Sequence, residues 1–485
     1  MSTEMISEVL PASTPTRLLI GGEWVPTAAG LNVINPASYG TLATIGDAGI
    51  PEAIQAVDAA HDAFQTWSLT PSRMRAEILR RAYEIMVSEV EDCARLIMLE
   101  NGKAWRDALG EATYAAEFFR WFSEEAARVE GGFRYAPNRD KTIITDYRPM
   151  GVAYMITPWN FPAAMITRKL GPALAAGCTA VIKPPAETPL TALWIAEVLQ
   201  RAGVPDGVVN MVTTSKAGEV STAILADPRV ATLSFTGSTY VGKLLLKQTA
   251  ERVLPSSMEL GGNAPFLVLE GANVDQAVEG AMIAKMRNGG SACTAANRFY
   301  VHESLSAEFA DKFEAALRAI KIGPGTDKAN ELGAMVSDKE RDKIIDLVNQ
   351  AEAEGVQITE TGVAPSTGAF VVPRMARGVE HGSVLTRNEV FGPVVPIVTV
   401  TNTDEAVQMA NDTEYGLISY VYAKDAGEGI KVARRMESGM VAINRGIASD
   451  PAAPFGGMKE SGLGREGGFA GIHEFLETQY FAVDL

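Results

Sequence analysis

The chain has 485 residues, of which 47 % are hydrophobic and 21 % are charged, and 43 basic against 59 acidic side chains leave a net charge of -16. Its length exceeds what one hydrophobic core usually organises, so we expect a globular protein of two or more domains. The acidic balance makes nucleic acid and anionic membranes poor partners.

The cysteines and histidines indicate a reducing compartment and no metal site. Cys93, Cys178 and Cys293 lie far apart without CxxC spacing, which argues against a disulfide framework. Only four histidines are present and they are scattered, so we expect no zinc. No segment approaches the ~20 apolar residues that a membrane helix requires, and no basic region precedes an apolar run at the N-terminus. We therefore expect a cytoplasmic protein.

Apolar spacing divides the chain into a hairpin, a helical layer and two α/β stretches. RLLIGGEWV, at residues 17–25, is typical of a hairpin turned by a Gly-Gly pair. From Pro51 to about Gly131 the apolar positions recur at helical spacing and predict a helical layer. After Gly151, β-rich runs alternate with helical ones, and a second alternation follows Glu259. This pattern indicates βαβ units with parallel sheets, in two halves.

The first α/β half contains a candidate phosphate turn. FTGSTYVG, at residues 235–242, follows an apolar strand and precedes a helical stretch, where backbone N–H groups and the helix dipole stabilise a phosphate. The spacing is not GxGxxG, and such a turn needs glycine for conformational reasons alone. Lys183, in AVIKPP, leaves another strand of the same half, where the carboxyl ends of parallel strands line a ligand crevice. The combination favours a nucleotide, although a solvated lysine is the commoner fate of such a residue.

Three segments carry groups suited to covalent carbonyl chemistry. Cys293 lies in RNGGSACTAANR, where the glycines leave room for a substrate and let its N–H point at a developing oxyanion; a small buried cysteine is the alternative. Glu259, in MELGGNAPF, ends a strand and suits a general base, with a surface glutamate as the alternative. Asn160, in TPWNFP, adds a side-chain amide. A Cys/His hydrolase is disfavoured because His302, the nearest histidine, falls inside a predicted strand.

In order along nearly the whole chain, these motifs resemble those of the aldehyde dehydrogenase family. The matching pieces are TPWNFP, the KP turn after AVI, FTGST, MELGGNAP, the glycine-rich turn before Cys293, and NEVFGP at residues 388–393. A finer pattern, with NFPAAMITRKLGPALAAGC, ELGGNAPF, ANR and APFGGMKESGLGRE, is similar to the succinate-semialdehyde dehydrogenase branch.

The resemblance implies an α/β fold in three parts. These are a Rossmann-type cofactor-binding domain at 1–128 and 150–258, an α/β catalytic domain at 259–469, and a small β oligomerisation extension at 129–149 and 470–485. The alternating TIITDY pattern is compatible with an edge strand that seeks a partner, and the C-terminal ETQYFAVDL is expected to pair across subunits. The implied assembly is a homodimer or a homotetramer built from two dimers.

The resemblance also implies an activity, the NAD(P)-dependent oxidation of an aldehyde to an acid. Cys293 would attack the carbonyl as a thiolate, and the Asn160 amide with the Cys293 N–H would hold the oxyanion. Glu259 would activate the water that hydrolyses the thioester. The implied cofactor contacts are Trp159, Lys183, Ala186, Gly237, Ser238, Gly242, Leu260, Glu389 and Phe391.

Departures from the family pattern concern the cofactor and the cysteine loop. Members that prefer NAD usually carry Glu three residues after the KP-turn lysine, whereas this chain has Ala186 there and Glu187 next. A 2′-phosphate would then meet no facing carboxylate, so we expect NADP to be accepted and slightly favoured, unless Glu187 turns in and restores NAD. Ser291 replaces a usual Gln. Ala295 replaces a second cysteine found in part of the branch, so no redox switch is expected.

An anionic semialdehyde, with succinate semialdehyde first, is the implied substrate. Arg168, Arg298 and Ser449 match positions that hold the distal carboxylate in the branch, and an arginine fork pairs bidentately with an oxyacid. A structural arginine bonded to backbone carbonyls is the alternative for each. A sulfonated aldehyde, or glutarate or 2-oxoglutarate semialdehyde, would suit the same fork. The intact Cys293 and Glu259 disfavour a CoA-acylating enzyme and a non-enzymatic protein on this scaffold.

Overall fold

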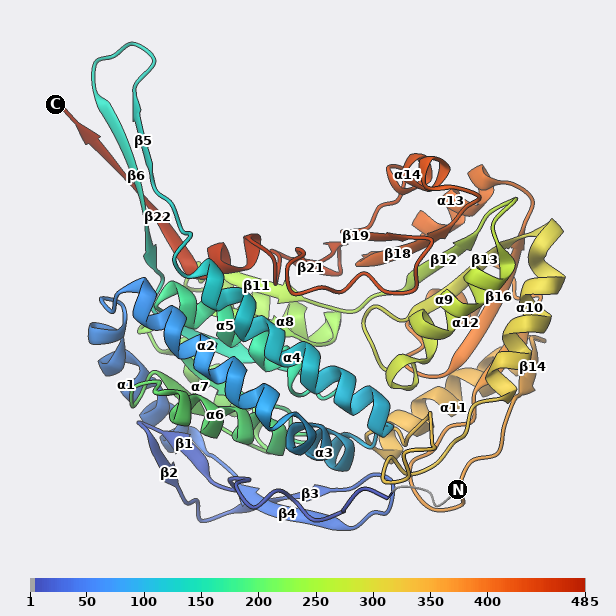
Figure 1. Cartoon of the computed structure of the whole chain (residues 1–485), viewed down its shortest axis with the longest axis horizontal. Coiled ribbons are helices and arrows are strands. Elements are labelled where there is room, and N and C mark those ends of the chain that lie inside the picture. The colour runs from blue at the N-terminus through green and yellow to red at the C-terminus, as the bar shows by residue number, and fades with distance from the viewer. Residues whose placement is uncertain (1–4, 485) are drawn as a thin grey trace.

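The structure of the protein is a computed structural model and describes residues 5–484. Two large β-sheets with helices on both faces form two halves, and a long hairpin projects from the first half together with the C-terminal strand (Figure 1). The predicted α/β fold is confirmed. Residues 1–4 and 485, which the predicted domain ranges include, lie outside the described part of the chain.

The first half is built on an eight-stranded sheet. Its strands are β1 (Leu18–Ile20), β2 (Glu23–Val25), β7 (Val152–Ile156), β8 (Thr179–Lys183), β9 (Val209–Met211), β10 (Val230–Thr236), β11 (Ser256–Glu259) and β21 (Gly462–Leu463). Their order is β2-β1-β9-β8-β7-β10-β11-β21, and the five strands from β9 to β11 run parallel. β1 and β2 form the predicted antiparallel hairpin, with Leu18 opposite Val25.

Helices cover both faces of this sheet because side chains alternate along each strand. On β7, Val152, Tyr154 and Ile156 face one core, and Ala153 and Met155 face the other. The first core lies under α1 (Ile50–Trp67), α7 (Ala217–Ala226) and α8 (Thr239–Ala250). The second lies under α2 (Ser72–Ser88), α3 (Val90–Asn101), α4 (Trp105–Glu125), α5 (Ala164–Ala176) and α6 (Leu190–Ala202). The helical layer predicted before the first βαβ unit corresponds to α1 to α4.

The second half is built on a seven-stranded sheet in the order β14-β15-β16-β13-β12-β18-β19. Its strands are β12 (Ala264–Val268), β13 (Ala296–His302), β14 (Gln357–Glu360), β15 (Arg374–Arg377), β16 (Val394–Val400), β18 (Ile418–Tyr422) and β19 (Met440–Ile443). All neighbours are parallel except β14 with β15. Its helices are α9 (Val274–Met286), α10 (Glu303–Arg318), α11 (Asp338–Ala353), α12 (Val384–Arg387), α13 (Thr403–Asn411) and α14 (Ala426–Ala433).

The projecting extension is a three-stranded antiparallel sheet with β6 (Thr142–Pro149) between β5 (Gly132–Tyr135) and β22 (Leu476–Val483). One expectation needs correction, because TIITDY forms the central strand and not an edge. The C-terminal strand pairs along one edge with β6 of its own chain, from Leu476 opposite Pro149 to Val483 opposite Thr142, and its pairing across subunits stays a prediction for the other edge. A hairpin of two strands is marginally stable by itself, and the C-terminal segment supplies the third strand.

Shorter elements complete the fold. They are the pairs β3 (Gly30–Ile34) with β4 (Thr41–Gly46) and β17 (Tyr415–Gly416) with β20 (Met458–Lys459), and the 3₁₀ turns η1 (Arg287–Gly290) and η2 (Ala470–Phe475). Two segments lie across the predicted domain boundaries: β21 joins the first sheet beside β11, and η2 packs on the core of the first half. Within residues 5–484, no helix combines the length and apolar character needed to cross a membrane.

Candidate active site

The three predicted catalytic residues meet where the first sheet faces the second half. β7, β10 and β11 are parallel neighbours and end at one edge, and β11 ends at Glu259 itself. The segment after β7 carries Asn160 to this edge. The loop that follows α9 and η1 brings Cys293 from the second half. Residues far apart in the chain therefore share one site, as expected for the carboxyl ends of parallel strands.

The turn before the thiol is held in a left-handed backbone. Asn288 and Gly290 have φ angles of 51° and 80°. A Cβ on Gly290 would lie 2.4 Å from the carbonyl oxygen of Gly392, so glycine is required for this approach to the NEVFGP segment. The N–H of Asn288 donates to the Asp107 carboxylate at 2.9 Å. Backbone geometry and hydrogen bonds thus hold the glycine-rich turn before Cys293 in place.

Cys293 is partly exposed and forms part of a cavity wall together with Arg168 and Arg287. Burial, followed by the nearby Glu259 carboxyl, raises the pKa of its thiol well above the ordinary value, whereas the two guanidinium groups lower it. Since the thiolate is the nucleophilic form of cysteine, the two arginines favour the reactive state.

Asn160 is tied to the loop that carries the thiol. Its side chain is buried, and its Nδ2 donates to the carbonyl oxygen of Ser291 at 3.2 Å. A side-chain amide has two N–H donors, so one remains after this bond. The backbone carbonyl of Asn160 in turn accepts from Asn288 Nδ2 at 2.8 Å. Hydrogen bonds in both directions therefore join the segment of the predicted oxyanion donor, Asn160, to the loop that carries Cys293.

Glu259 is a buried carboxyl without a hydrogen-bond partner on either oxygen. Burial, reinforced by the neighbouring Glu466, raises its pKa to about 8, although Arg168 and Lys169 oppose the rise. Glu466 is held by Lys169 at 2.6 Å and by Arg168 at 3.4 Å. Burial raises the pKa of Glu466, but these two cations outweigh it and the net shift is downward. The two carboxyl groups are thus shifted in opposite directions, the pKa of Glu259 upward and that of Glu466 downward.

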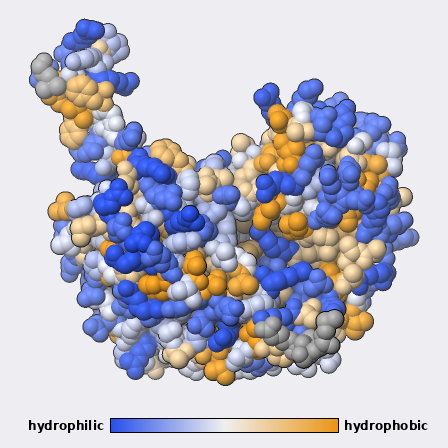
Figure 2. Space-filling model, viewed as in Figure 1, coloured by the Kyte–Doolittle hydropathy of each residue, from blue (hydrophilic) through white to orange (hydrophobic). Residues whose placement is uncertain are grey.

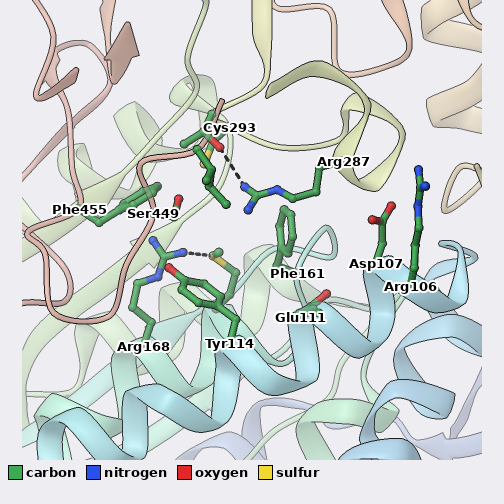
Figure 3. A pocket seen from close by; sticks show the side chains of 14 residues that line it. Arg106, Asp107, Glu111, Tyr114, Phe161, Arg168, Arg287, Cys293, Ser449 and Phe455 are labelled. Carbon is green, nitrogen blue, oxygen red and sulfur yellow. Dashed lines mark hydrogen bonds between the residues drawn. The ribbon is translucent and has the colours of Figure 1, made fainter. Parts of the chain in front are cut away.

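The cavity beside Cys293 has a volume of about 240 Å³, and its wall carries the cations Arg106, Arg168 and Arg287 together with the carboxyl groups of Asp107 and Glu111 (Figure 3). Arg168 is 2 % exposed, and its Nε and Nη1 make no hydrogen bond with a described residue, although Nη1 lies 3.4 Å from Glu466 Oε2 as an ion pair. Its guanidinium carbon lies 4.1 Å from the ring centroid of Phe455. Ser449 lies on the same wall. Because a buried cation with unused donors is costly, this corner is suited to an anionic ligand.

The predicted cofactor residues line the other side of the same sheet edge. Ser238 caps α8 by accepting from the N–H of Val241, which leaves that helix N-terminus open to an anion. A Cβ on Gly242 would lie 2.5 Å from Leu260 Cδ2, and one on Gly237 would lie 2.5 Å from Phe235 Cζ. The glycines therefore keep the backbone close to its neighbours at this turn.

Lys183 and the NEVFGP segment complete this side. Lys183 is buried, and burial lowers its pKa to about 8; among the described residues its Nζ hydrogen-bonds to the adjacent Pro184 carbonyl, at 3.1 Å. The Glu389 carboxylate accepts from the N–H of Gly262 at 3.1 Å, and burial raises the pKa of this group to about 7. The rings of Phe391 and Trp159 meet edge to face at 5.5 Å. An open helix N-terminus and a buried lysine with unused donors fit a dinucleotide.

Comparison with known proteins decides the family. Residues 24–481 match the aldehyde dehydrogenase family. This chain belongs to the aldehyde dehydrogenase family. A succinate-semialdehyde dehydrogenase of Paenarthrobacter nicotinovorans is 48 % identical over 444 residues, which is 91 % of this chain and 98 % of that one. The NADP-dependent succinate-semialdehyde dehydrogenase of Escherichia coli is 43 % identical over 96 % of this chain and 97 % of its own.

Solved structures agree with this assignment. The crystal structure of succinate-semialdehyde dehydrogenase from Burkholderia pseudomallei has a TM-score of 0.96 and 41 % identity, and covers 99 % of this chain and 100 % of that one. An NAD+ complex of an aldehyde dehydrogenase from Bacillus cereus has a TM-score of 0.94 and 32 % identity, and covers 97 % of this chain and 96 % of its own. Aldehyde dehydrogenases use NAD or NADP.

For this aldehyde dehydrogenase, the prediction that Arg298 binds the substrate is wrong. Arg298 is fully buried on β13 and does not line the cavity with Cys293. Its guanidinium donates to the backbone carbonyls of Asn263 (2.9 Å), Met409 (3.2 Å) and Ala410 (2.8 Å). Because side chains alternate along a strand, Arg298 lies on the same face of the sheet as Tyr300, away from the thiol. It is the structural arginine that was the alternative.

Sequence reasoning missed two of the three arginines that line the cavity, Arg106 and Arg287. Arg287 opens η1 and lies beside the thiol, where its Nη2 donates to Thr294 Oγ1 at 3.4 Å (Figure 3). The sequence signal was present, since RNGGSAC begins with this arginine. The sequence of a glycine-rich turn does not show in which direction its first side chain points, so it gives no reason to place Arg287 at the cavity. Tyr114 of α4, which also lines the cavity, gave no signal beyond helical periodicity.

Proposed function

We propose that this aldehyde dehydrogenase oxidises an anionic semialdehyde, with succinate semialdehyde first, to the corresponding dicarboxylate. The observation that carries the proposal is the cavity in which Arg168, Arg287 and Ser449 stand around the approach to Cys293. A distal carboxylate on this wall would place an aldehyde at the thiol, and it would satisfy the guanidinium donors that are unused. The relatives named above support the same substrate.

The residues of the chain account for the covalent steps. The Cys293 thiolate adds to the aldehyde carbon, and the oxygen becomes an oxyanion beside the free N–H of Asn160 and the Cys293 backbone N–H. When bound, a nicotinamide dinucleotide held by Lys183, Ser238 and Glu389 supplies the hydride acceptor. Hydrolysis of the thioester then needs a water from which Glu259 removes the proton, which releases the acid and restores the thiol.

NADP is the slightly favoured cofactor in this proposal, and NAD is the alternative. Ala186 is partly exposed, and Glu187 beside it is exposed and makes no hydrogen bond with another described residue. A 2′-phosphate near Lys183 would therefore meet no carboxylate held by hydrogen bonds, although the Glu187 carboxylate is close enough to Lys183 to oppose the fall of the lysine pKa. Comparing kcat/KM with both cofactors tests the preference; a higher value with NAD would assign Glu187 to the ribose.

A homodimer or homotetramer is the assembly proposed. The extension leaves the outer edges of β5 and β22 without a strand partner among the described residues. Apolar side chains project from it into solvent, with Phe133 62 % and Phe481 39 % exposed (Figure 2). Open strand edges beside apolar side chains are the features that a second subunit covers.

The deciding experiment is an aldehyde panel assayed with NAD and NADP. It includes succinate and glutarate semialdehydes, 2-oxoglutarate semialdehyde, a sulfonated aldehyde and neutral butanal, with Cys293→Ala as the inactive control. We expect the highest kcat/KM with succinate semialdehyde. A preference for butanal would contradict the anionic substrate, and full turnover by Cys293→Ala would contradict the mechanism. A higher kcat/KM with another anionic aldehyde would identify that aldehyde as the substrate and would still agree with recognition of an anion by the arginines of the cavity.

A further inference from the structure

A buried ion pair outside the catalytic trio lies directly behind Asn160. Lys103 follows the C-terminus of α3, and Glu111 lies on α4. Their side chains are 1 % and 0 % exposed, and Lys103 Nζ is 2.5 Å from Glu111 Oε2. A buried ion pair contributes little stability on average, so its position calls for another role.

Each member of the pair holds the segment that carries the predicted oxyanion donor. Lys103 Nζ donates to the backbone carbonyl of Asn160 at 2.8 Å, and it lies 4.4 Å from the ring centroid of Phe161. The second oxygen of Glu111 accepts from the N–H groups of Ala163 (2.9 Å) and Ala164 (3.4 Å), at the start of α5. The backbone is therefore gripped on both sides of the catalytic amide.

The same helix also reaches the cysteine loop. Asp107 lies one helical turn before Glu111 on α4 and accepts from the N–H of Asn288. The side chain of Asn288 bonds to the carbonyls of both Asn160 and Ser291. Lys103 and Asn288 thus share one acceptor, the Asn160 carbonyl. The start of α4 is connected in this way to the amide and to the thiol loop.

We propose that Lys103 and Glu111 are positioning residues that set the place of the Asn160 amide relative to Cys293. Glu111 lines the cavity, but its side chain is 0 % exposed and is engaged by Lys103 and by the N–H of Ala163, so in this proposal the pair acts through the Asn160 segment. The inference rests on the proposed function, in which Asn160 stabilises the oxyanion. Misplacing a catalytic group by ~1 Å can cost about 10²-fold in rate, so loss of this anchor should lower kcat more than it changes KM.

A mutant cycle tests the proposal. Lys103→Met with Glu111→Gln removes both charges together, which avoids leaving one buried charge unpaired, and Gln retains an acceptor for α5. This double variant is compared with wild type, with Asn160→Ala, and with the triple variant. Lys312→Met with Glu308→Gln, an exposed pair on α10, is the matched control.

We expect the double variant to lose about 10-fold or more in kcat with succinate semialdehyde, with KM within about 3-fold, since only placement of the oxyanion donor changes. In the Asn160→Ala background the same double change should cost less than about 3-fold, because residues acting as a unit are not additive. The control pair should retain wild-type kcat. An unchanged kcat, or an equal loss in both backgrounds, would overturn the proposal.

Two further measurements keep the result interpretable. If the Met variant does not fold, Lys103→Gln with Glu111→Gln is measured instead, in which an amide N–H can still donate to the Asn160 carbonyl; kcat should then stay within about 3-fold of wild type, and a loss of about 10-fold or more with this donor retained would overturn the proposal. If Asn160→Ala itself retains wild-type kcat, the proposed function of Asn160 fails. That outcome is distinct from a failure of the positioning pair.

Discussion

Two arginines of this aldehyde dehydrogenase have opposite surroundings at equal burial. Arg168 has unused donors at the cavity, whereas Arg298 is saturated by backbone carbonyls. We expect Arg168→Ala to raise KM for succinate semialdehyde at least about 10-fold, because a charge-assisted contact of ~1.5–3 kcal/mol is lost, and to leave KM for butanal nearly unchanged. An equal change for both aldehydes would contradict recognition of an anion.

Arg298→Ala is the matched variant on the structural side. It leaves the buried carbonyls of Asn263 and Ala410 without the guanidinium donor, whereas that of Met409 keeps the Tyr300 hydroxyl, so we expect the free energy of unfolding to fall by about 3 kcal/mol. KM for succinate semialdehyde in the folded fraction should stay within about 2-fold of wild type. Denaturant unfolding and steady-state kinetics check the two parts. A large rise in KM without loss of stability would restore Arg298 to the substrate site.

The pKa of Glu259 sets the expected pH dependence of hydrolysis. A general base must be ionised, and this carboxyl has a pKa of about 8, so hydrolysis-limited kcat should rise with pH and level off above about 8.

Variants of two carboxyl groups test this pH dependence. The Glu466 charge raises the pKa of Glu259, so Glu466→Gln should move the midpoint of the pH profile to lower pH. Glu259→Gln should give one burst of reduced cofactor and then stall. A pH-independent kcat between 6 and 9, with hydrolysis rate-limiting, would contradict ~8 as the controlling pKa.

At the scale of elements, η1 approaches the NEVFGP segment so closely that position 290 must be glycine. An Ala at Gly290 would place Cβ against the Gly392 carbonyl and strain a φ of 80°. We expect Gly290→Ala to lower kcat/KM by about 10²-fold and to cost ~1–3 kcal/mol of stability, because the turn must move. Gly218→Ala on α7 is the control, since its Cβ meets nothing within 4 Å. Equal activity of the two variants would show that the turn adapts.

At the scale of the whole molecule, the extension projects from the body and packs little against the rest of its own chain. Its strands β5, β6 and β22 project from the body and expose apolar side chains (Figures 1 and 2). Removing residues 477–485 would expose the edge of β6, so we expect the assembly to shift toward smaller species in sedimentation velocity. Assembly indistinguishable from the full chain would show that the association surface lies elsewhere.

Much of this architecture could be predicted from the sequence. Hydrophobic periodicity indicated the hairpin β1–β2, the helices α1 to α4 and two α/β halves, because repeats of about two and 3.6 residues follow directly from strand and helix geometry. Ordered motifs indicated the family and the residues Cys293, Glu259 and Asn160. Predictions failed where a residue's direction mattered: Arg298 had a suitable type, but its strand face points away from the thiol.

The sequence by itself determined the fold class, the family and the identity of the reactive groups, since these depend on local periodicity and on short motifs. Only the tertiary structure decided which cations face the cavity, that TIITDY lies between two strands, and that Lys103 stands behind Asn160. Lys103 is near the Asn160 amide only after segments distant in the chain pack together, and Arg287, although close to Cys293 in the sequence, faces the cavity only because of the backbone of η1. Side-chain direction and long-range contact depend on that packing, and no local pattern encodes them.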